Sequence, residues 1–539
     1  MKKIFYPDFF NDVFGPIMQP GSSGGFAGPT RIGNVAASLI DGKPDSVKFL
    51  FNREDTNVSH LASFMTDRGY LGGVQGFLTD DVRLFDAHAL ARQSGISYEF
   101  GYLASANSHI RSVRIEITSE RGDSGSLVAA SIGGGMIRVY EVNGFKLDWQ
   151  SDTYGVLVQG KPGQSAPESG PFEKAFSAAF INVLPVESID GRKGLFLELS
   201  EKPDRATLQK YFPDYGLVLL PALLPVITTR VRSPQLFTTV AEWRKVAEVR
   251  GITFAQAAIE YEKAFSGWTD GKIWAYFEKI AGILHHQIHA LEEIGYDNAA
   301  DTPLLPIYGK YWDKYITSKQ KISDNLTNHI LIHAFSTNAK LPGVKIVPGP
   351  MGTGGGYLFS ALDAVREDRG YSHERLIESL AVAAALGALA YTHTNASGEV
   401  GCVGESGVCC AMAAGAVTWL AGGDGIQVER AASMALQANI GIPCDPIPGG
   451  LEFPCVTRTF RAAVTAPLYA DLALAGIDPL IPYHEMLQNI ETNFRRSNPA
   501  DLCDSACGCN RTPTAAECMR FLKSETANDL FYRRETANQ

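Results

Sequence analysis

Three cysteines in the last third of this 539-residue chain have the surroundings of cofactor ligands. Each lies in a Gly- or Pro-rich bend: Cys402 in Val-Gly-Cys-Val-Gly, Cys444 in Ile-Pro-Cys-Asp-Pro, and Cys455 in Phe-Pro-Cys-Val. In such a bend a thiolate can point into a cleft instead of packing on a helix face. Three thiolates around one point suit an iron–sulfur cluster or a zinc ion. A four-iron cluster held by three thiolates keeps one iron without a protein ligand, and that iron can act as a Lewis acid on a hydroxyl group.

The spacing of these cysteines does not decide whether they bind a cluster, a zinc ion or nothing. The intervals of 42 and 11 residues contain no C-x-x-C pair, so a cluster, a structural zinc and plain core cysteines all fit. All nine cysteines lie after residue 401, which disfavours a disulfide framework and favours a metal or cluster region. We expect Cys409 and Cys410 to be buried as small hydrophobic residues inside a helical run.

Composition and charge exclude several classes of protein. The net charge is −10 with no Lys/Arg-rich run, so nucleic acid is not the expected partner. The longest strongly apolar run, 380–391, is too short to span a bilayer, and no membrane partner is expected. The N-terminal residues include a Pro and an Asp where a signal peptide needs an apolar core. A cytoplasmic location is therefore predicted.

The elements that must position these residues change along the chain, and they predict an α+β multidomain fold. Residues 1–150 mix loops, helices and alternating strands, as expected for an α/β domain. Residues 151–228 read as a small βαββαβ unit, the ferredoxin-like arrangement. Residues 229–500 carry apolar residues at helical spacing and predict an all-α domain that holds the three cysteines. Residues 501–539 form a polar, Cys-rich tail.

The motifs around the cysteines resemble the alpha domain of iron–sulfur L-serine dehydratases. The resemblance rests on the segments 395–402, 410–416 and 444–455, and the intervals between the cysteines match that family. Upstream, segments 14–33 and 131–135 resemble the family's beta domain, with the βαββαβ unit, similar to an ACT-type regulatory module, between the two. The resemblance implies a serine-dehydratase beta-like domain, an ACT-like unit and a cluster-binding alpha-like domain in one chain, and a homodimer as the assembly.

The resemblance also implies a cofactor and a reaction. Cys402, Cys444 and Cys455 would hold a [4Fe-4S] cluster whose free iron takes the β-hydroxyl of a small amino-acid substrate, while a base removes the α-proton. Cys509 or Cys518 in the tail would cap the free iron in the resting state. A separate metal and simple surface thiols remain open for the tail, which also contains Cys503 and Cys507. The substrate-binding candidates are Ser22, Ser23, Gly24, Asn395, Ser397 and Gly398.

The sequence departs from the family at the positions expected to bind substrate and to remove the proton. Two glycines follow the serine pair where the family has His-Thr, and Tyr70 stands where the family has a Gly-His-Gly stretch. Tyr70 and His109 are therefore the candidate bases, although a tyrosine is a poor base near neutral pH. These departures keep other β-substituted substrates open: another hydroxy amino acid, a hydroxy acid, or cysteine in a desulfidase reaction. A non-catalytic amino-acid or redox sensor is the alternative from another class.

Two histidine pairs and one glycine loop are further candidate sites. His285 and His289 stand four residues apart, as do His329 and His333, which is the spacing of two ligands on one helix face. Neither pair has the H-E-x-x-H pattern, so partly exposed polar residues are the favoured interpretation. The loop 347–356 lacks the features of a phosphate-binding motif, and we expect its glycines to permit close backbone approach.

Overall fold

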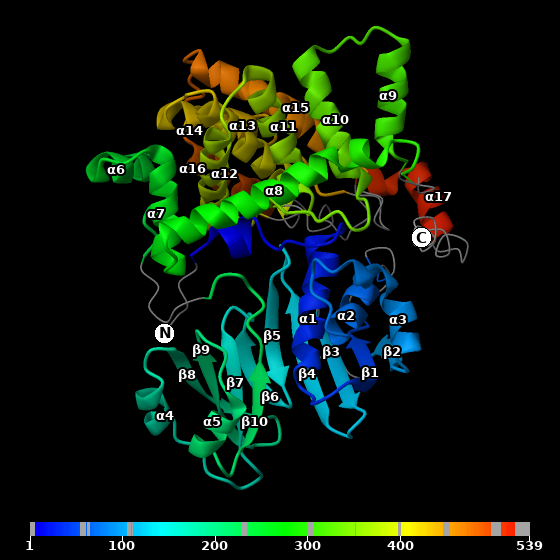
Figure 1. Ribbon diagram of the computed structural model, residues 1–539, viewed down its shortest axis with the longest axis vertical. Coiled ribbons are helices and arrows are strands. Elements are labelled where there is room, and N and C mark those ends of the chain that lie inside the picture. The colour runs from blue at the N-terminus through cyan, green and yellow to red at the C-terminus, as the bar shows by residue number, and fades with distance from the viewer. Residues whose placement is uncertain are drawn as a thin grey trace. The chain divides into compact units, whose positions relative to one another are not determined.

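The chain folds into two units, which we describe separately (Figure 1). The computed structural model describes residues 6–53, 61, 65–104, 109, 112–227, 234–299, 306–350, 352–396, 400–445, 453–496 and 508–522. One unit, Ser22–Arg232, contains both sheets and is called the sheet unit below. The other combines Met1–Gly21 with Ser233–Gln539 and is called the helical unit. The predicted combination of an N-terminal sheet region and a C-terminal helical region is confirmed.

A six-stranded sheet forms the larger part of the sheet unit. Its order is β2-β1-β3-β4-β5-β6; β1 and β2 are parallel, and the other neighbours are antiparallel. In β3 the apolar residues alternate with polar ones, so that one face is buried under helices. The elements are α1 (Gly28–Ala37), β1 (Pro44–Phe51), α2 (Thr66–Val74), α3 (Ala87–Gln93), β2 (Ser97–Tyr102), β3 (Val113–Ser119), β4 (Ser124–Ser131), β5 (Ile137–Val142) and β6 (Phe145–Trp149).

A four-stranded antiparallel sheet follows, and its elements have the predicted βαββαβ order. Its strand order is β10-β7-β9-β8, and all neighbouring strands are antiparallel. Leu157, Phe196 and Val218 from this sheet join the core of the six-stranded sheet, so the two sheets share one unit. The elements are β7 (Tyr154–Gln159), α4 (Gly170–Ala175), β8 (Phe180–Glu187), β9 (Lys193–Leu199), α5 (Arg205–Tyr211) and β10 (Gly216–Leu220). Its likeness to an ACT module stays a prediction.

The helical unit is built around two helices that are rich in Ala and Gly, α12 and α13. Because their side chains are small and apolar all round, neighbouring helices approach closely and cover every face. Its helices are α6 (Val240–Arg250), α7 (Phe254–Ser266), α8 (Asp270–Ile294), α9 (Tyr308–Ser318), α10 (Asn325–Ala339), α11 (Gly354–Arg369), α12 (His373–His393), α13 (Val408–Leu420), α14 (Gly425–Gln437), α15 (Cys455–Leu474), α16 (Tyr483–Arg496) and α17 (Pro513–Leu522).

Two segments of this unit are long and apolar enough to cross a membrane, by length and composition alone. They are α12 and the helical run Val403–Leu420. Within the unit, 78% and 94% of their most apolar windows are buried by neighbouring helices. Burial of this kind is what a core helix of a globular unit requires, and it gives their apolar character a packing explanation.

The N-terminal segment belongs to the helical unit, whereas the sequence grouped it with residues 1–150. The Tyr6 hydroxyl donates a hydrogen bond to the Tyr261 carbonyl (2.9 Å), and the Tyr261 hydroxyl donates to the Pro7 carbonyl (2.9 Å). Phe9 stacks on Tyr261 with ring centroids 5.5 Å apart, and its N–H donates to Glu262 (2.8 Å). These buried aromatic contacts with α7 explain why the segment belongs to the helical unit.

Candidate active site

Cys402 and Cys455 lie at the N-terminal ends of two helices. Cys402 immediately precedes the π-helical turn η6 (Val403–Gly407), which continues into α13, and Cys455 is the first residue of α15. The two thiols are in hydrogen-bond contact, and the Cys402 side chain is 3% exposed. The unsatisfied N–H groups at a helix N-terminus carry positive partial charge, which helps to stabilise a thiolate at Cys402.

The electrostatics of this pair differ sharply from those of an ordinary cysteine. A hydrogen bond with Cys455 lowers the pKa of Cys402 to about 6 despite burial, helped by Ser406, whose hydroxyl is 3.0 Å from the sulfur, and by Arg458. The same hydrogen bond, together with burial, raises the pKa of Cys455 well above its ordinary value. The pair therefore shares one proton, with the negative charge on Cys402.

The segment that carries Cys444 is held against the Cys402 bend by close backbone approach. Gly401 has φ +91°, and a Cβ atom there would lie 2.7 Å from the carbonyl oxygen of Ile442. Only glycine allows both the backbone angle and the contact. Cys444 itself is 6% exposed. The structure thus brings the three segments that carry Cys402, Cys444 and Cys455 together.

Arg458 and Asp445 connect these segments, and sequence reasoning missed both. Arg458 donates to the Pro443 carbonyl (2.7 Å), forms an ion pair with Asp445 (2.8 Å), and interacts with the Cys402 thiol. Burial raises the pKa of Asp445, but hydrogen bonds from the Cys509 backbone and from Arg458 outweigh burial and leave that pKa below its ordinary value. The signal was present: Arg458 is three residues after Cys455, and on a helix this spacing places both on one face.

The tail segment η8 (Gly508–Arg511) docks beside Cys444. The backbone N–H of Cys509 donates to the Asp445 carboxylate (2.9 Å), and its side chain interacts with the same group. Gly508 has φ +50°, and a side chain at this position would collide with Asp445. Cys518 lies in α17, and the tail positions Cys503 and Cys507 lie outside the described residues. The geometry distinguishes Cys509 from Cys518 by its contact with the residue next to Cys444.

Cys409 and Cys410 are buried in α13, as the sequence predicted. The Cys409 thiol donates to the Gly354 carbonyl (3.2 Å), and the Cys410 thiol to the Ala462 carbonyl (3.5 Å). Burial raises the pKa of Cys409 far above its ordinary value and that of Cys410 to about 11. Both are therefore neutral packing residues at physiological pH.

The glycine loop positions the start of α11 near the cysteines. A Cβ at Gly356 would lie 2.5 Å from the Gln287 side chain of α8, so glycine permits close helix packing there. At the next residue, burial raises the pKa of Tyr357 to about 12, with a smaller contribution from the Cys455 thiol. The loop therefore packs against α8, and the helix that follows it approaches Cys455.

In the sheet unit, the predicted substrate loop contacts segment 131–135, which the sequence compared with the family's beta domain. The Ser22 hydroxyl caps the π-helical turn η2 (Ser23–Ala27) by accepting from the Gly25 N–H (3.0 Å), and Ser23 is buried. The Ser131 hydroxyl donates to the Gly24 carbonyl (2.8 Å). Segment 22–28 and segment 131–135 therefore form one small structure within the unit.

The two candidate bases have different surroundings. Tyr70 is a core residue, 6% exposed, with its ring packed against Phe49 and Phe51 at centroid distances of 5.6 and 5.9 Å. These contacts give Tyr70 a packing role and provide no support for a catalytic one. His109 is exposed and stacks on Tyr140 with ring centroids 3.7 Å apart. His109 stays a prediction.

One histidine in the sheet unit, His88, has two side-chain partners that sequence reasoning missed. His88 lies 2.9 Å from the Asp67 carboxylate through one ring nitrogen and 2.9 Å from the Tyr98 hydroxyl through the other. No local sequence pattern connects residues 67, 88 and 98, because three separate elements bring them together. Of the substrate candidates in the helical unit, Asn395 is exposed after α12, and Ser397 and Gly398 lie outside the described residues.

The three cysteines do not have the close spacing of ligands around a single metal ion. Among the described residues, the sets of three or more ligand atoms within 4.8 Å of one another contain histidines and carboxylates, and the three cysteines do not form such a set. Two helix N-termini and the partly exposed Arg458 provide positive surroundings that favour thiolates.

Comparison with known proteins gives the family. Residues 249–502 match the family model "Serine dehydratase alpha chain". The chain is 32% identical over 203 residues to the probable L-serine dehydratase alpha chain of Bacillus subtilis, covering 36% of this chain and 68% of that protein. It is 27% identical over 256 residues to the L-serine dehydratase alpha chain of Peptoniphilus asaccharolyticus, covering 47% and 86%.

Two further matches extend the relationship. The beta chain of the Peptoniphilus asaccharolyticus L-serine dehydratase is 31% identical over 149 residues, covering 28% of this chain and 66% of the beta chain. L-serine dehydratase TdcG of Escherichia coli is 30% identical over 248 residues, covering 45% of this chain and about half, 54%, of that protein. The fold and these matches define a lyase scaffold. The chain belongs to the L-serine dehydratase family.

Proposed function

We propose that this protein is a [4Fe-4S]-dependent lyase that removes water, and then ammonia, from L-serine or a serine-like β-hydroxy amino acid. The observation that carries the proposal is the contact between the Cys402 and Cys455 thiols at two helix N-termini, with the Cys444 segment held alongside by Gly401 and Arg458. Membership of the L-serine dehydratase family supports the substrate class.

Cys402, Cys444 and Cys455 are the proposed cluster ligands. When bound, the cluster supplies a Lewis-acidic iron that activates the β-hydroxyl as a leaving group. Arg458 stabilises the negative charge of the Cys402 thiolate, and its ion pair with Asp445 fixes the segment next to Cys444. These contacts hold two of the three ligand segments in place before any cofactor binds.

The substrate is proposed to bind through neutral donors. Ser22 already accepts a hydrogen bond from the Gly25 N–H, so its own hydroxyl proton is free to be donated to a substrate carboxylate. Ser23, Gly24 and Asn395 are proposed as further contacts, and Ser397 and Gly398 stay predictions. His109 is the proposed base because its ring is exposed, whereas the Tyr70 ring is enclosed in the core.

The proposed reaction balances without an added oxidant or reductant. His109 accepts the α-proton, the Cα–H and Cβ–O bonds break, and a carbon–carbon double bond forms; the departing hydroxide takes the proton back from His109 and leaves as water. The released enamine tautomerises to an imine, and hydrolysis of the imine gives an oxo acid and ammonia.

Cys509 is the proposed cap of the fourth iron in the resting state. Its backbone donates to Asp445, the residue next to Cys444, and Gly508 permits this close approach. The docked tail would shield the open position until a substrate displaces it. The position of Cys518 in α17 offers no comparable contact among the described residues, which favours Cys509.

The test begins with protein purified without oxygen. We expect roughly four irons and four sulfides per chain and a brown colour that air bleaches. Serine in place of Cys402, Cys444 or Cys455 should remove both colour and activity, whereas Cys410→Ala should keep both. Three single variants that stay brown and active would refute the ligand assignment.

A substrate panel tests the reaction. L-serine, other β-hydroxy amino acids, hydroxy acids and L-cysteine are assayed for oxo acid, ammonia and sulfide. Release of oxo acid and ammonia from a hydroxy amino acid is the expected result. Sulfide from cysteine alone would make the protein a desulfidase, and cluster-loaded protein that binds amino acids without turnover would make it a sensor; either outcome contradicts the proposal.

A further inference from the structure

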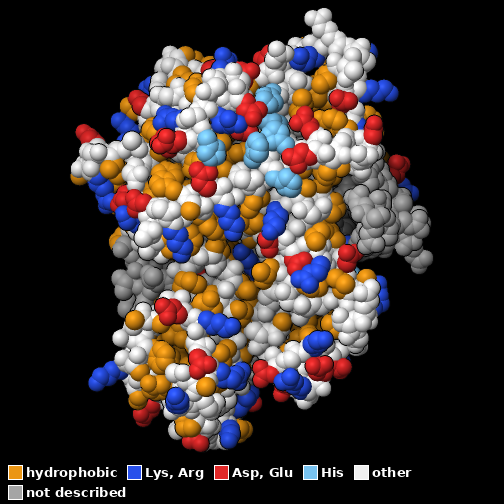
Figure 2. All heavy atoms as spheres, viewed as in Figure 1, with side chains coloured by type: hydrophobic (Ala, Val, Ile, Leu, Met, Phe, Trp, Pro, Cys, Tyr) orange, Lys and Arg blue, Asp and Glu red, His pale blue; other side chains and the backbone are white. Residues whose placement is uncertain are grey.

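Histidines gather on one face of the helical unit, as the pale blue side chains in Figure 2 show. His285 and His289 lie one turn apart on α8, and His329 and His333 lie one turn apart on α10. The rings form a continuous row, with His285–His289, His289–His333 and His329–His333 centroid distances of 4.4, 4.7 and 4.5 Å. Like-charged imidazolium groups would repel one another in such a row, so the arrangement needs an explanation.

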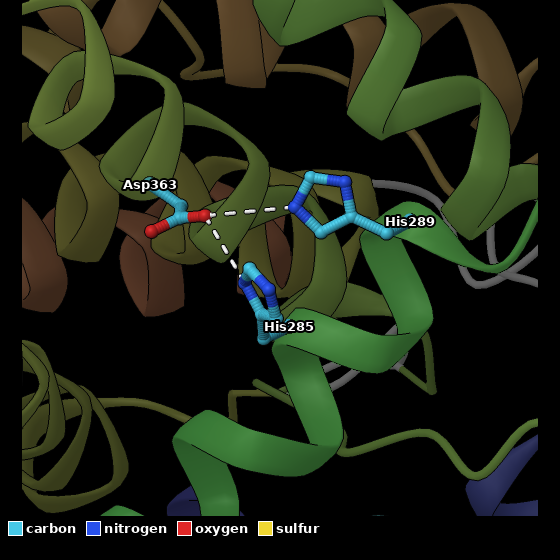
Figure 3. Close-up of side chains that lie close together, drawn as sticks. All are labelled: His285, His289 and Asp363. Atoms are coloured by element: carbon cyan, nitrogen blue, oxygen red, sulfur yellow. Dashed lines mark ion pairs between the residues drawn. The ribbon is translucent and has the colours of Figure 1, made fainter. Parts of the chain in front are cut away.

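A buried carboxylate from a third helix points at the first pair (Figure 3). The Asp363 Oδ2 atom on α11 lies 3.4 Å from His285 Nδ1 and 3.9 Å from His289 Nε2. All three ligand atoms lie within 4.8 Å of one another. A tetrahedral zinc ion with ligands at about 2.0–2.2 Å separates neighbouring ligand atoms by roughly 3.4 Å. The observed distances are therefore close to those of a three-ligand metal site.

Two of these atoms are buried without a hydrogen-bond partner. Asp363 is completely buried, and neither its Oδ2 atom nor the ring nitrogen Nε2 of His289 makes a hydrogen bond; the two atoms face each other only as a long ion pair of 3.9 Å. Leaving buried polar atoms without a hydrogen bond costs stability, more so for a charged carboxylate. A cation between them would satisfy both at once.

The other oxygen of Asp363 and the other ring nitrogen of His289 already face neighbouring charged groups. Arg366 Nε donates to Asp363 Oδ1 (2.6 Å), and the Glu292 carboxylate lies 3.6 Å from His289 Nδ1. A carboxylate next to the outer nitrogen of a ligating histidine orients the ring and increases its basicity, which is the usual support of a metal-binding imidazole. His285 is 54% exposed, so an ion can reach the site from solvent.

The second histidine pair differs in its carboxylate. Glu367 is partly exposed, and it is already paired with His329 (3.2 Å) and with Arg366 (2.9 Å). No buried carboxylate oxygen is left unsatisfied in that group, so it has less need of an ion. His333 is 1% exposed, and burial lowers its pKa to about 3, so it packs beside His289 as a neutral ring.

We propose that His285, His289 and Asp363 bind one divalent first-row transition ion, for which zinc is the best match, with a fourth position open to solvent. Imidazole and carboxylate ligands suit zinc, and its four-coordinate geometry fits three protein ligands and one water. The ion would connect α8 to α11, the helix that begins in the glycine loop. The site is separate from the cysteine group and does not depend on the proposed reaction.

The test uses full-length protein without a polyhistidine tag, purified, stripped with a chelator and titrated with zinc and, separately, cobalt. We expect His285→Ala to bind one ion fewer per chain than the wild type, and zinc to raise the melting temperature of the wild type but not of this variant. The matched control is His373→Ala, an exposed histidine paired with Glu278, which should behave as the wild type. Glu292→Gln should weaken binding by about 10- to 100-fold.

Cobalt separates this site from the cysteines. Cobalt bound to histidine and carboxylate gives visible absorbance, whereas cobalt bound to cysteine also gives thiolate charge-transfer bands. In His285→Ala the histidine–carboxylate absorbance should vanish, and any thiolate bands should remain. His329→Ala should retain the ion. Equal stoichiometry and equal thermal shift in the wild type and His285→Ala, or loss of the ion in His329→Ala instead, would overturn the proposal.

Discussion

At the scale of single residues, Cys402, Cys409 and Cys410 show how position controls the chemistry of a thiol. All three are buried within nine residues of one another, yet the pKa of Cys402 is lowered while the pKa values of the other two are raised. Cys402 precedes a helix and meets a thiol, a hydroxyl and a guanidinium, whereas Cys409 and Cys410 face carbonyl oxygens of α11 and α15. Burial alone therefore does not determine reactivity; the neighbouring donors do.

Glu262 gives a prediction on the pH dependence of stability. Burial raises its pKa to about 8, so the folded chain keeps a proton that the unfolded chain loses above pH of about 4.5. The stabilisation from this proton is complete below that pH and is lost as pH rises through 8, by about 1.4 kcal/mol per pH unit. Glu262→Gln has no charge to bury and should become progressively more stable than the wild type across this range.

Melting temperatures of both proteins from pH 4.5 to 8 check this expectation. Glu260→Gln is the matched control, since Glu260 lies on the same helix but pairs with Arg250 and Lys263 near the surface. A difference between Glu262→Gln and the wild type that stays constant with pH would mean that Glu262 is ionised in the folded protein.

At the scale of elements, the site depends on the bends that carry Cys402 and Cys444. A substitution at Gly401, where the two bends approach each other, tests this dependence. A methyl group at position 401 would meet the Ile442 carbonyl at 2.7 Å, so Gly401→Ala should push the Cys402 and Cys444 segments apart. Gly422 has the same φ of +91° but open space around it, so Gly422→Ala carries only the backbone strain of about 1–2 kcal/mol. We expect Gly401→Ala to lose most of its iron and Gly422→Ala to retain it, measured by iron analysis of anaerobic protein.

The tail segment η8, which contains Cys509, provides a second prediction at this scale. If Cys509 shields the cluster, Cys509→Ala should bleach in air at least several-fold faster than the wild type, while Cys518→Ala should bleach at the wild-type rate. The absorbance decay after exposure to air measures both. Unchanged decay in Cys509→Ala, or faster decay in Cys518→Ala alone, would count against Cys509.

At the scale of the whole molecule, the helical unit is completed by the N-terminal segment. Tyr6, Phe9 and Phe10 are fully buried against α7 and α8, and loss of a buried aromatic side chain typically costs about 3–5 kcal/mol. A fragment of residues 233–539 should therefore melt well below the full chain or aggregate. A peptide of residues 1–21 added to the fragment should raise its melting temperature.

A peptide of the same length with Ser at positions 6, 9 and 10 is the control and should have no effect. A fragment that is as stable without the segment as with it would show that the aromatic contacts add little. Thermal unfolding, followed by circular dichroism at 222 nm (about the helix minimum), is a suitable measurement for this largely helical fragment.

The sequence alone determined the features that depend on local pattern. Periodicity and small residues predicted the helical region, alternation predicted the βαββαβ order, and Gly/Pro bends pointed to Cys402, Cys444 and Cys455. Those signals are local because secondary structure follows from neighbouring residues. The family could be inferred from the same segments, because each is a short motif that can be recognised in the sequence itself.

Only the tertiary structure decided which distant residues meet. Arg458 joins Cys402 to Asp445, the first 21 residues complete the helical unit, and Asp363 supplies the buried oxygen that turns a common histidine pair into a metal-site candidate. It also gave Tyr70 a packing role, because only the folded sheet encloses its ring. Such contacts depend on how helices and strands pack, and packing is set by the whole chain and not by any short stretch of it.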